Sequence, residues 1–203
     1  MASTSSPYGF EPISDMTGVI RPLRIPNGIT SGYGYNIFTN TPVTLDPSTG
    51  TIAAVRATTD QIFGVFIGCE YTPTGGDPRK LPFWAANATF AVSSGNNAID
   101  DMYAYVIPAW LPGVRYRVQA DGIVAQTALG MQFNVSNFTD GSTITGQAAC
   151  TVAYAGVADN SQGQFVLEEF YPGINSAVGD AYTDLIVGIA YPQIGNGYQN
   201  SIG

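Results

Sequence analysis

The run IFGVFIGCEYT, at residues 62–72, is the most strand-like stretch of this sequence. Its Val, Ile, Phe and Tyr side chains favour extended backbone, because branched and aromatic groups pack well on a pleated surface. The run ends at Pro73 and at the turn-forming sequence Gly75-Gly76-Asp77-Pro78. An apolar strand bounded by such turn residues is typical of an all-β protein.

Outward from this run, short strands and turns alternate in both directions. We expect about eleven strands at a spacing of roughly 8–15 residues, as in a sandwich or barrel. Besides residues 62–72, they are Thr30–Phe38, Pro42–Leu45, Thr51–Arg56, Leu81–Val92, Met102–Trp110, Tyr116–Ala120, Met131–Val135, Ala149–Ala155, Gln164–Phe170 and Tyr182–Ala190. Val124–Gly130 is the one segment expected to form a helical turn. The predicted fold is an all-β, jelly-roll-like β-sandwich or small barrel.

The first 29 residues differ from the rest of the chain. They contain four prolines, Pro7, Pro12, Pro22 and Pro26, so neither a helix nor a central strand is expected there. They also carry large apolar side chains, which indicates an extended segment that docks on its own domain or on a neighbouring subunit. We therefore divide the chain into an N-terminal arm (1–29), an all-β domain (30–190) and a C-terminal tail (191–203).

Charge excludes several partners. Charged residues make up 11% of the chain, whereas a typical soluble domain has about 25%. Seven basic residues against 15 acidic ones give a net charge of −8, and no basic residue follows Arg117. Such a chain repels phosphate, so neither nucleic acid nor an anionic membrane is expected as a partner. We find no secretory signal at the start and no apolar run long enough to span a bilayer.

Catalytic and metal-binding patterns are weak. The chain has no His, which removes the Ser-His-Asp, Cys-His and His–metal arrangements. Two acidic pairs, Asp100-Asp101 and Glu168-Glu169, could in principle serve glycoside hydrolysis. Adjacent residues of a strand point to opposite faces, however, so neither pair can flank one bond alone. Asp180 and Asp184 lack the spacing of a calcium loop. We expect no enzyme, no cofactor and no metal site.

The cysteines and tryptophans are expected to be buried core residues without a functional role. Cys69 and Cys150 are expected to be reduced, buried and small, since two cysteines make no disulfide framework. Trp84 and Trp110 could stack on sugars, but each lies in an apolar strand and is expected in the core.

Several blocks of the sequence resemble one protein family. They are SPYGFEPI (6–13), NIFTNTPVTLDPSTGTI (36–52), GVFIGCEYT (64–72), VQADGIVAQTALG (118–130) and INSAVGDAYTDLIVGIAYP (174–192). In this order and spacing they resemble a group of tailed-bacteriophage virion structural proteins of the head decoration, or cement, type. The resemblance implies a non-enzymatic capsid protein that binds the outer surface of the head and stabilises the lattice of the major capsid protein.

The expected partners follow from this resemblance. They are the major capsid protein and further copies of the chain, as a homodimer or homotrimer, on a virion made in the bacterial cytoplasm. We expect the capsid or subunit contacts on the arm, at Tyr8, Phe10, Ile13, Arg21, Leu23 and Arg24. Two other hypotheses remain open: a carbohydrate-binding module of a tail fibre or spike, and a head–tail connector or other tail component.

Overall fold

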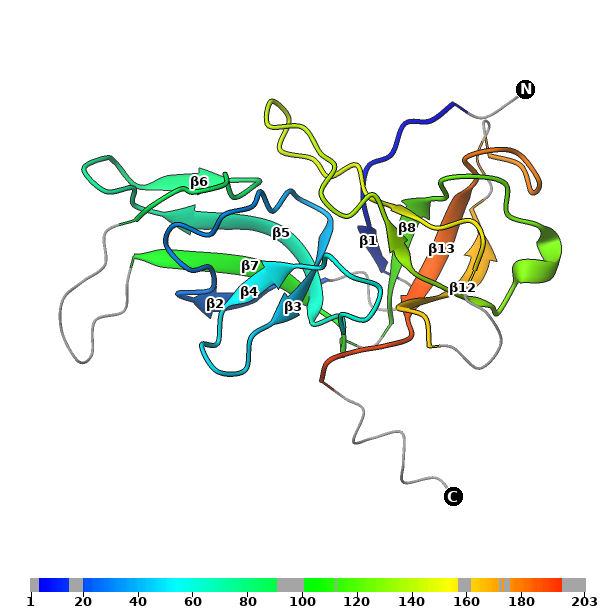
Figure 1. Ribbon diagram of the computed structural model, residues 1–203, viewed down its shortest axis with the longest axis horizontal. Helices are drawn as coiled ribbons and strands as arrows, with labels where there is room; N and C mark the ends of the chain where they lie inside the picture. The colour runs from blue at the N-terminus through cyan, green and yellow to red at the C-terminus, as the bar shows by residue number, and fades with distance from the viewer. Residues whose placement is uncertain are drawn as a thin grey trace, which may run out of the picture.

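The computed structural model describes residues 4–14, 20–90, 101–111, 113–156, 162–171, 173 and 176–194. In this part of the chain the regular structure is antiparallel β-sheet, with a single turn of 3-10 helix, η1 (Gln126–Ala128). The prediction of an all-β fold is confirmed, and so is the helical turn within residues 124–130. No helix among the described residues is long and apolar enough to cross a membrane. Figure 1 shows two groups of strands that lie side by side along the longest axis of the molecule.

The first group, which we call the inserted sheet, comes from the first half of the chain. Its strands run in the order β2-β7-β5-β3-β4, and β6 pairs with the outer part of β5. Their bounds are β2 (Leu23–Pro26), β3 (Thr41–Leu45), β4 (Ile52–Ala54), β5 (Gly64–Tyr71), β6 (Arg79–Leu81) and β7 (Met102–Pro108).

The second group, which we call the terminal sheet, combines strands from both ends of the chain. Its strands run in the order β1-β8-β13-β12-β9, and a small ladder of β10 and β11 lies beside it. Their bounds are β1 (Glu11–Ser14), β8 (Val114–Gln119), β9 (Gln132–Phe133), β10 (Val135–Ser136), β11 (Thr151–Val152), β12 (Phe165–Phe170) and β13 (Asp184–Ile189). The inserted sheet thus lies in sequence between β1 and β8, two neighbouring strands of the terminal sheet.

The proline-rich N-terminal segment supplies one edge strand to each sheet. β1 contains Pro12 and pairs only with β8, while β2 ends at Pro26 and pairs only with β7. Proline cannot donate a backbone hydrogen bond, which confines it to such edges. Within the described residues of 1–29, the expectation that no helix and no central strand forms is therefore confirmed.

Two predicted strands form mostly turns and isolated bridges, and the predicted strand Ala149–Ala155 shrinks to Thr151–Val152. Residues 30–38 form turns, with one isolated bridge between Ile37 and Trp84 in place of a ladder. Of residues 81–92, Leu81 ends β6, single bridges form at Trp84 and Phe90, and residues 91–92 lie outside the described part. The apolar side chains of these stretches are nevertheless buried against the inserted sheet, since Ile37, Trp84 and Phe90 all belong to its core.

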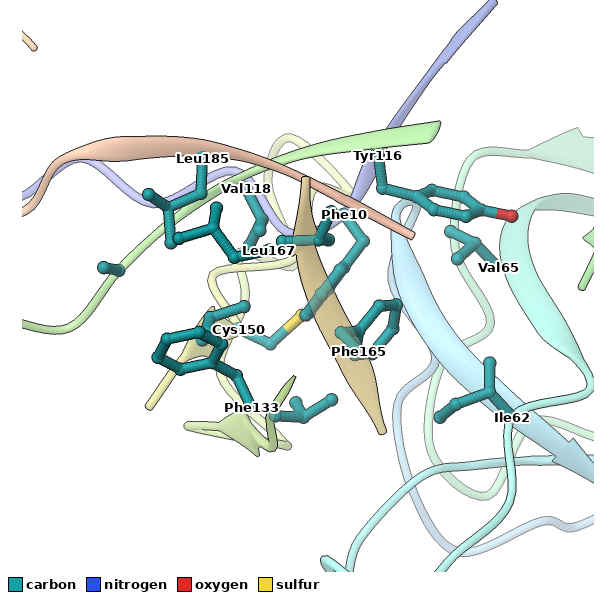
Figure 2. Close-up of a cluster of buried hydrophobic side chains, with 14 of the residues drawn as sticks. Phe10, Ile62, Val65, Tyr116, Val118, Phe133, Cys150, Phe165, Leu167 and Leu185 are labelled. Atoms are coloured by element: carbon teal, nitrogen blue, oxygen red, sulfur yellow. The ribbon is translucent and has the colours of Figure 1, made fainter. Parts of the chain in front are cut away.

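Two clusters of buried side chains hold the fold together. One fills the space behind the inserted sheet, around Phe66, Trp84 and Val106. The other joins the two sheets, since it combines Val65 of β5 with residues of the terminal sheet. Figure 2 shows this second cluster, with side chains from both groups of strands directed towards one another.

The chain returns to the inserted sheet after β13. Ile62 donates its backbone N–H to the carbonyl of Tyr191 (2.9 Å), and Gln193 donates to the carbonyl of Ile62 (2.9 Å). The Gln193 side chain also accepts a hydrogen bond from the N–H of Leu45 at 2.7 Å. Residues 191–193, which we expected in a tail, are thus attached to β3 and to the entry of β5; residues 195–203 lie outside the described part.

Candidate binding surface

Phe10 anchors the N-terminal segment in the core between the sheets. Its ring is fully buried and stacks on Phe165 with 4.3 Å between the ring centroids, and Figure 2 shows it within the cluster. Its backbone N–H donates to the carbonyl of Asn40 (2.8 Å). The preceding Gly9 has φ = 74°, and a β-carbon there would lie 2.7 Å from the Asn40 oxygen, so only glycine fits.

A polar cluster fastens the same segment to the terminal sheet. The Arg117 guanidinium lies over the rings of Tyr8 (4.7 Å) and Tyr171 (4.9 Å) and forms an ion pair with Glu11 (2.6 Å). The hydroxyl of Tyr8 is buried, and burial raises the pKa of this group well above its ordinary value. Burial also raises the pKa of the neighbouring Asp184 carboxyl. This cluster positions the segment, and within it Arg117 neutralises Glu11.

The six expected contact residues fall into two groups. Tyr8, Phe10 and Ile13 lie on the terminal sheet, and Ile13 pairs with Arg115 in the β1–β8 ladder. Because Phe10 is part of this chain's own core, it cannot also contact a neighbour, and that expectation is corrected. The other three, Arg21, Leu23 and Arg24, lie in or just before β2 and are exposed.

An apolar hollow of about 370 Å³ adjoins this exposed segment. It lies where β5 bulges between Phe66 and Gly68, so that the regular ladder with β7 is interrupted. Its lining comes from four separate parts of the inserted sheet. The lining residues are Pro22, Ile67, Gly68, Cys69, Lys80, Leu81, Pro82 and Tyr105.

Cations border the hollow. The Lys80 ammonium lies 5.4 Å from the ring centroid of Tyr105, and the Arg24 guanidinium lies 3.4 Å from that of Tyr103. The Tyr105 hydroxyl donates to Glu70 (2.9 Å), and this hydrogen bond raises the pKa of Tyr105. Aromatic rings leave a cation its full charge. Within the described residues, neither Lys80 nor Arg24 forms an ion pair with a carboxylate. We call this surface the basic hollow.

Charge is divided unequally between the two sheets. By sequence, residues 20–111 carry five basic and six acidic residues, a net charge of −1. The rest of the chain carries two basic and nine acidic residues, hence −7 of the total of −8. Both of those arginines are engaged, since Arg115 bonds Glu168 (2.6 Å) and Arg117 bonds Glu11. The available positive charge therefore lies on the inserted sheet.

The acidic residues considered for catalysis are exposed wherever the structure describes them. Asp101 accepts a hydrogen bond from Thr72 (2.5 Å), and Asp100 lies outside the described part. Glu168 and Glu169 are both exposed beside a bulge in β12. Among the described residues, no three Cys, Asp or Glu side chains gather where they could hold a metal ion.

The cysteines and tryptophans divide between core and surface. Cys69 and Cys150 are free and buried, as predicted, and they lie in different clusters. Trp84 is fully buried, which confirms it as a core residue. Trp110 is 41% exposed and packs edge-on against Phe63, so its expected place in the core is corrected.

Sequence reasoning missed the basic hollow. Its floor and rim come together only through the pairing of β5 with β6 and β7, which join residues far apart in the chain. The one local signal is Gly68 within an apolar strand, which often marks a bulge. Comparisons with protein families, with curated proteins and with solved structures give no match to this chain.

Proposed function

We propose that this chain is a non-enzymatic decoration protein of a tailed-phage head. It binds the outer surface of the capsid and stabilises the lattice of the major capsid protein. The family resemblance of the sequence suggests the role. The observation that carries it is the exposed β2 segment, where Arg21, Leu23 and Arg24 present two cations and an apolar side chain next to the basic hollow.

The geometry of β2 suits attachment to another protein. As an edge strand it leaves one row of backbone N–H and C=O groups without a strand partner. Arg24 within the strand and Arg21 just before it add positive charge to a molecule whose net charge is −8. A single contact of this size is weak, but a lattice repeats it many times, and the sum helps the expanded shell resist the internal pressure of the packaged DNA.

The test is co-sedimentation of the protein with expanded, undecorated heads of the phage that encodes it. We expect saturable binding at on the order of hundreds of copies per head, as a repeated lattice predicts. Reversal of both charges, in Arg21→Glu with Arg24→Glu, should abolish this binding. The control is Arg56→Glu, which removes an equally exposed cation that stacks on Tyr35 (3.4 Å) away from β2.

Two results would overturn the proposal. Wild-type protein that does not bind expanded heads is not a decoration protein. Saturation at the small copy number of a neck component would identify a head–tail connector instead.

The carbohydrate-binding alternative rests on Trp110, whose half-exposed ring could stack on a sugar. It predicts that a glycan quenches the fluorescence of Trp110, while the buried Trp84 does not respond. The Trp110→Phe variant should lose the response. No quenching across a glycan panel would remove this candidate.

A further inference from the structure

A second exposed surface lies on the terminal half of the molecule. Four large apolar side chains are solvent-exposed there, although water is an unfavourable environment for them. A β-carbon on Gly122, the residue before Ile123, would lie 2.8 Å from ring atoms of Tyr154. A β-carbon on Gly156, two residues after Tyr154, would lie 3.5 Å from the end of Met131, which is ordinary van der Waals contact. We call this surface the apolar patch; its members are Ile123, Leu129, Met131 and Tyr154.

One carboxylate, that of Asp121, borders the apolar patch. Asp121 accepts the backbone N–H of Tyr154 at 2.7 Å and so lies at its margin. No Lys or Arg occurs anywhere after Arg117, whereas seven Asp and Glu do. Asp121 thus places one negative charge beside the apolar side chains of the patch. The basic hollow has an apolar lining and carries two cations, Lys80 and Arg24, against one carboxylate, Glu70, hence a net positive charge. The two surfaces are complementary in both respects.

The two surfaces of one molecule cannot meet. Figure 1 places β6, which lines the basic hollow, towards one end of the long axis, and η1, next to Leu129, at the other end. Their complementarity can only be satisfied between molecules. A contact between two different surfaces at opposite ends is heterologous, so it links copies head to tail.

We infer that copies of this chain associate end to end, with the apolar patch of one copy seated on the basic hollow of the next. The hollow takes an apolar side chain of the patch between Ile67 and Tyr105. Lys80 then faces the acidic margin of the patch, where Asp121 lies. The inference goes beyond attachment to a capsid, since it concerns only the chain's own two surfaces.

The experiment is sedimentation velocity of the purified protein without phage heads. Concentrations run from about 1 μM to 1 mM, which brackets weak interfaces. The buffer contains about 0.15 M salt, where the Debye length is about 8 Å, so that charges at the contact dominate over the net charge. We expect the weight-average sedimentation coefficient of the wild type to rise with concentration.

Two variants block one surface each. Lys80→Glu reverses the charge at the basic hollow, and Leu129→Asp places a charge in the apolar patch. Each should weaken self-association at least about tenfold. Matched controls are Arg56→Glu and Ile144→Asp; Ile144 is 95% exposed and lies outside the patch. All four side chains are exposed, so each variant should keep the wild-type unfolding midpoint.

A mixture of the two blocked variants gives the decisive result. Lys80→Glu keeps an intact patch and Leu129→Asp keeps an intact hollow, so together they should form a 1:1 complex that does not grow further. A wild type that stays monomeric at every concentration, a blocked variant that self-associates as tightly as the wild type, or a mixture without the 1:1 complex would each overturn the inference. Head binding is measured separately, so either proposal can fail without the other.

Discussion

Replacing Phe10 with alanine tests whether the N-terminal segment belongs to the core of its own chain. The ring is fully buried and stacks on Phe165 at 4.3 Å between centroids. Truncation of a buried phenylalanine costs about 3–5 kcal/mol, from lost burial and from the cavity that remains. The stability of a whole domain is about 5–15 kcal/mol. The variant should therefore lose a large fraction of the free energy of unfolding.

The assay is equilibrium unfolding in urea, followed by tryptophan fluorescence and by far-UV circular dichroism. With a slope of about 2 kcal/mol per molar urea, the midpoint should fall by about 2 M. The control is Ile144→Ala, because that side chain is 95% exposed and its truncation should change stability by no more than about 0.5 kcal/mol.

A loss below about 1 kcal/mol for Phe10→Ala would refute the reasoning, since that is the scale of an ordinary substitution. The segment would then not occupy its own core in solution, and a neighbouring subunit would become its place of docking. A large loss would show that the segment is part of the fold of its own chain, so that removing it would impair folding as well as any binding.

Three further predictions concern other parts of the fold. In Gly188→Ala, the new β-carbon would overlap an oxygen of the Glu168 carboxylate and displace this group from its ion pair with Arg115. The free energy of unfolding, measured in urea, should therefore fall by no more than about 1 kcal/mol, the value of a surface ion pair. In a Glu168→Gln background the cost should shrink, and an unchanged cost would contradict the assignment. Cys69 and Cys150 should react with a thiol reagent only after unfolding, since burial raises the pKa of each thiol to about 12; rapid labelling of the native protein would be inconsistent with this. Burial raises the folded-state pKa of Asp184, so its contribution to stability is present below the unfolded pKa and is lost as pH rises through the folded value. Asp184→Asn should therefore gain stability relative to wild type between about pH 3 and pH 7, whereas a difference independent of pH would show that the carboxyl titrates normally.

Local sequence patterns were sufficient to find the long strands. β5 and β7 are apolar runs that end at proline, and the predicted strands at these positions agree with the structure within a few residues. Prolines also excluded helices and central strands from the N-terminal segment, although the edge strands β1 and β2 were not predicted. These features depend on side chains close in sequence, so a single sequence contains the information.

Contacts between residues far apart in the sequence could not be predicted from local patterns. Residues 30–38 have the composition of a strand, but their apolar side chains are buried in turns against the inserted sheet. Phe10 was predicted to contact a neighbouring subunit, because no residue close to it in sequence indicates that its ring stacks on Phe165. The basic hollow depends on the bulge at Gly68 and on the approach of Lys80 to Tyr105, which strand pairing decides.

The insertion of one sheet between β1 and β8 has a consequence for the order of folding during synthesis. All strands of the inserted sheet leave the ribosome before β8 does, so this sheet can pair while the terminal sheet is still incomplete. β1, with Phe10 beside it, must wait for β8, and β8 gains its second neighbour only when β13 emerges. Until then the nascent chain exposes an unpaired strand and an aromatic ring, the features that chaperones bind. Translation speed over residues 114–189 should therefore govern the yield of soluble protein.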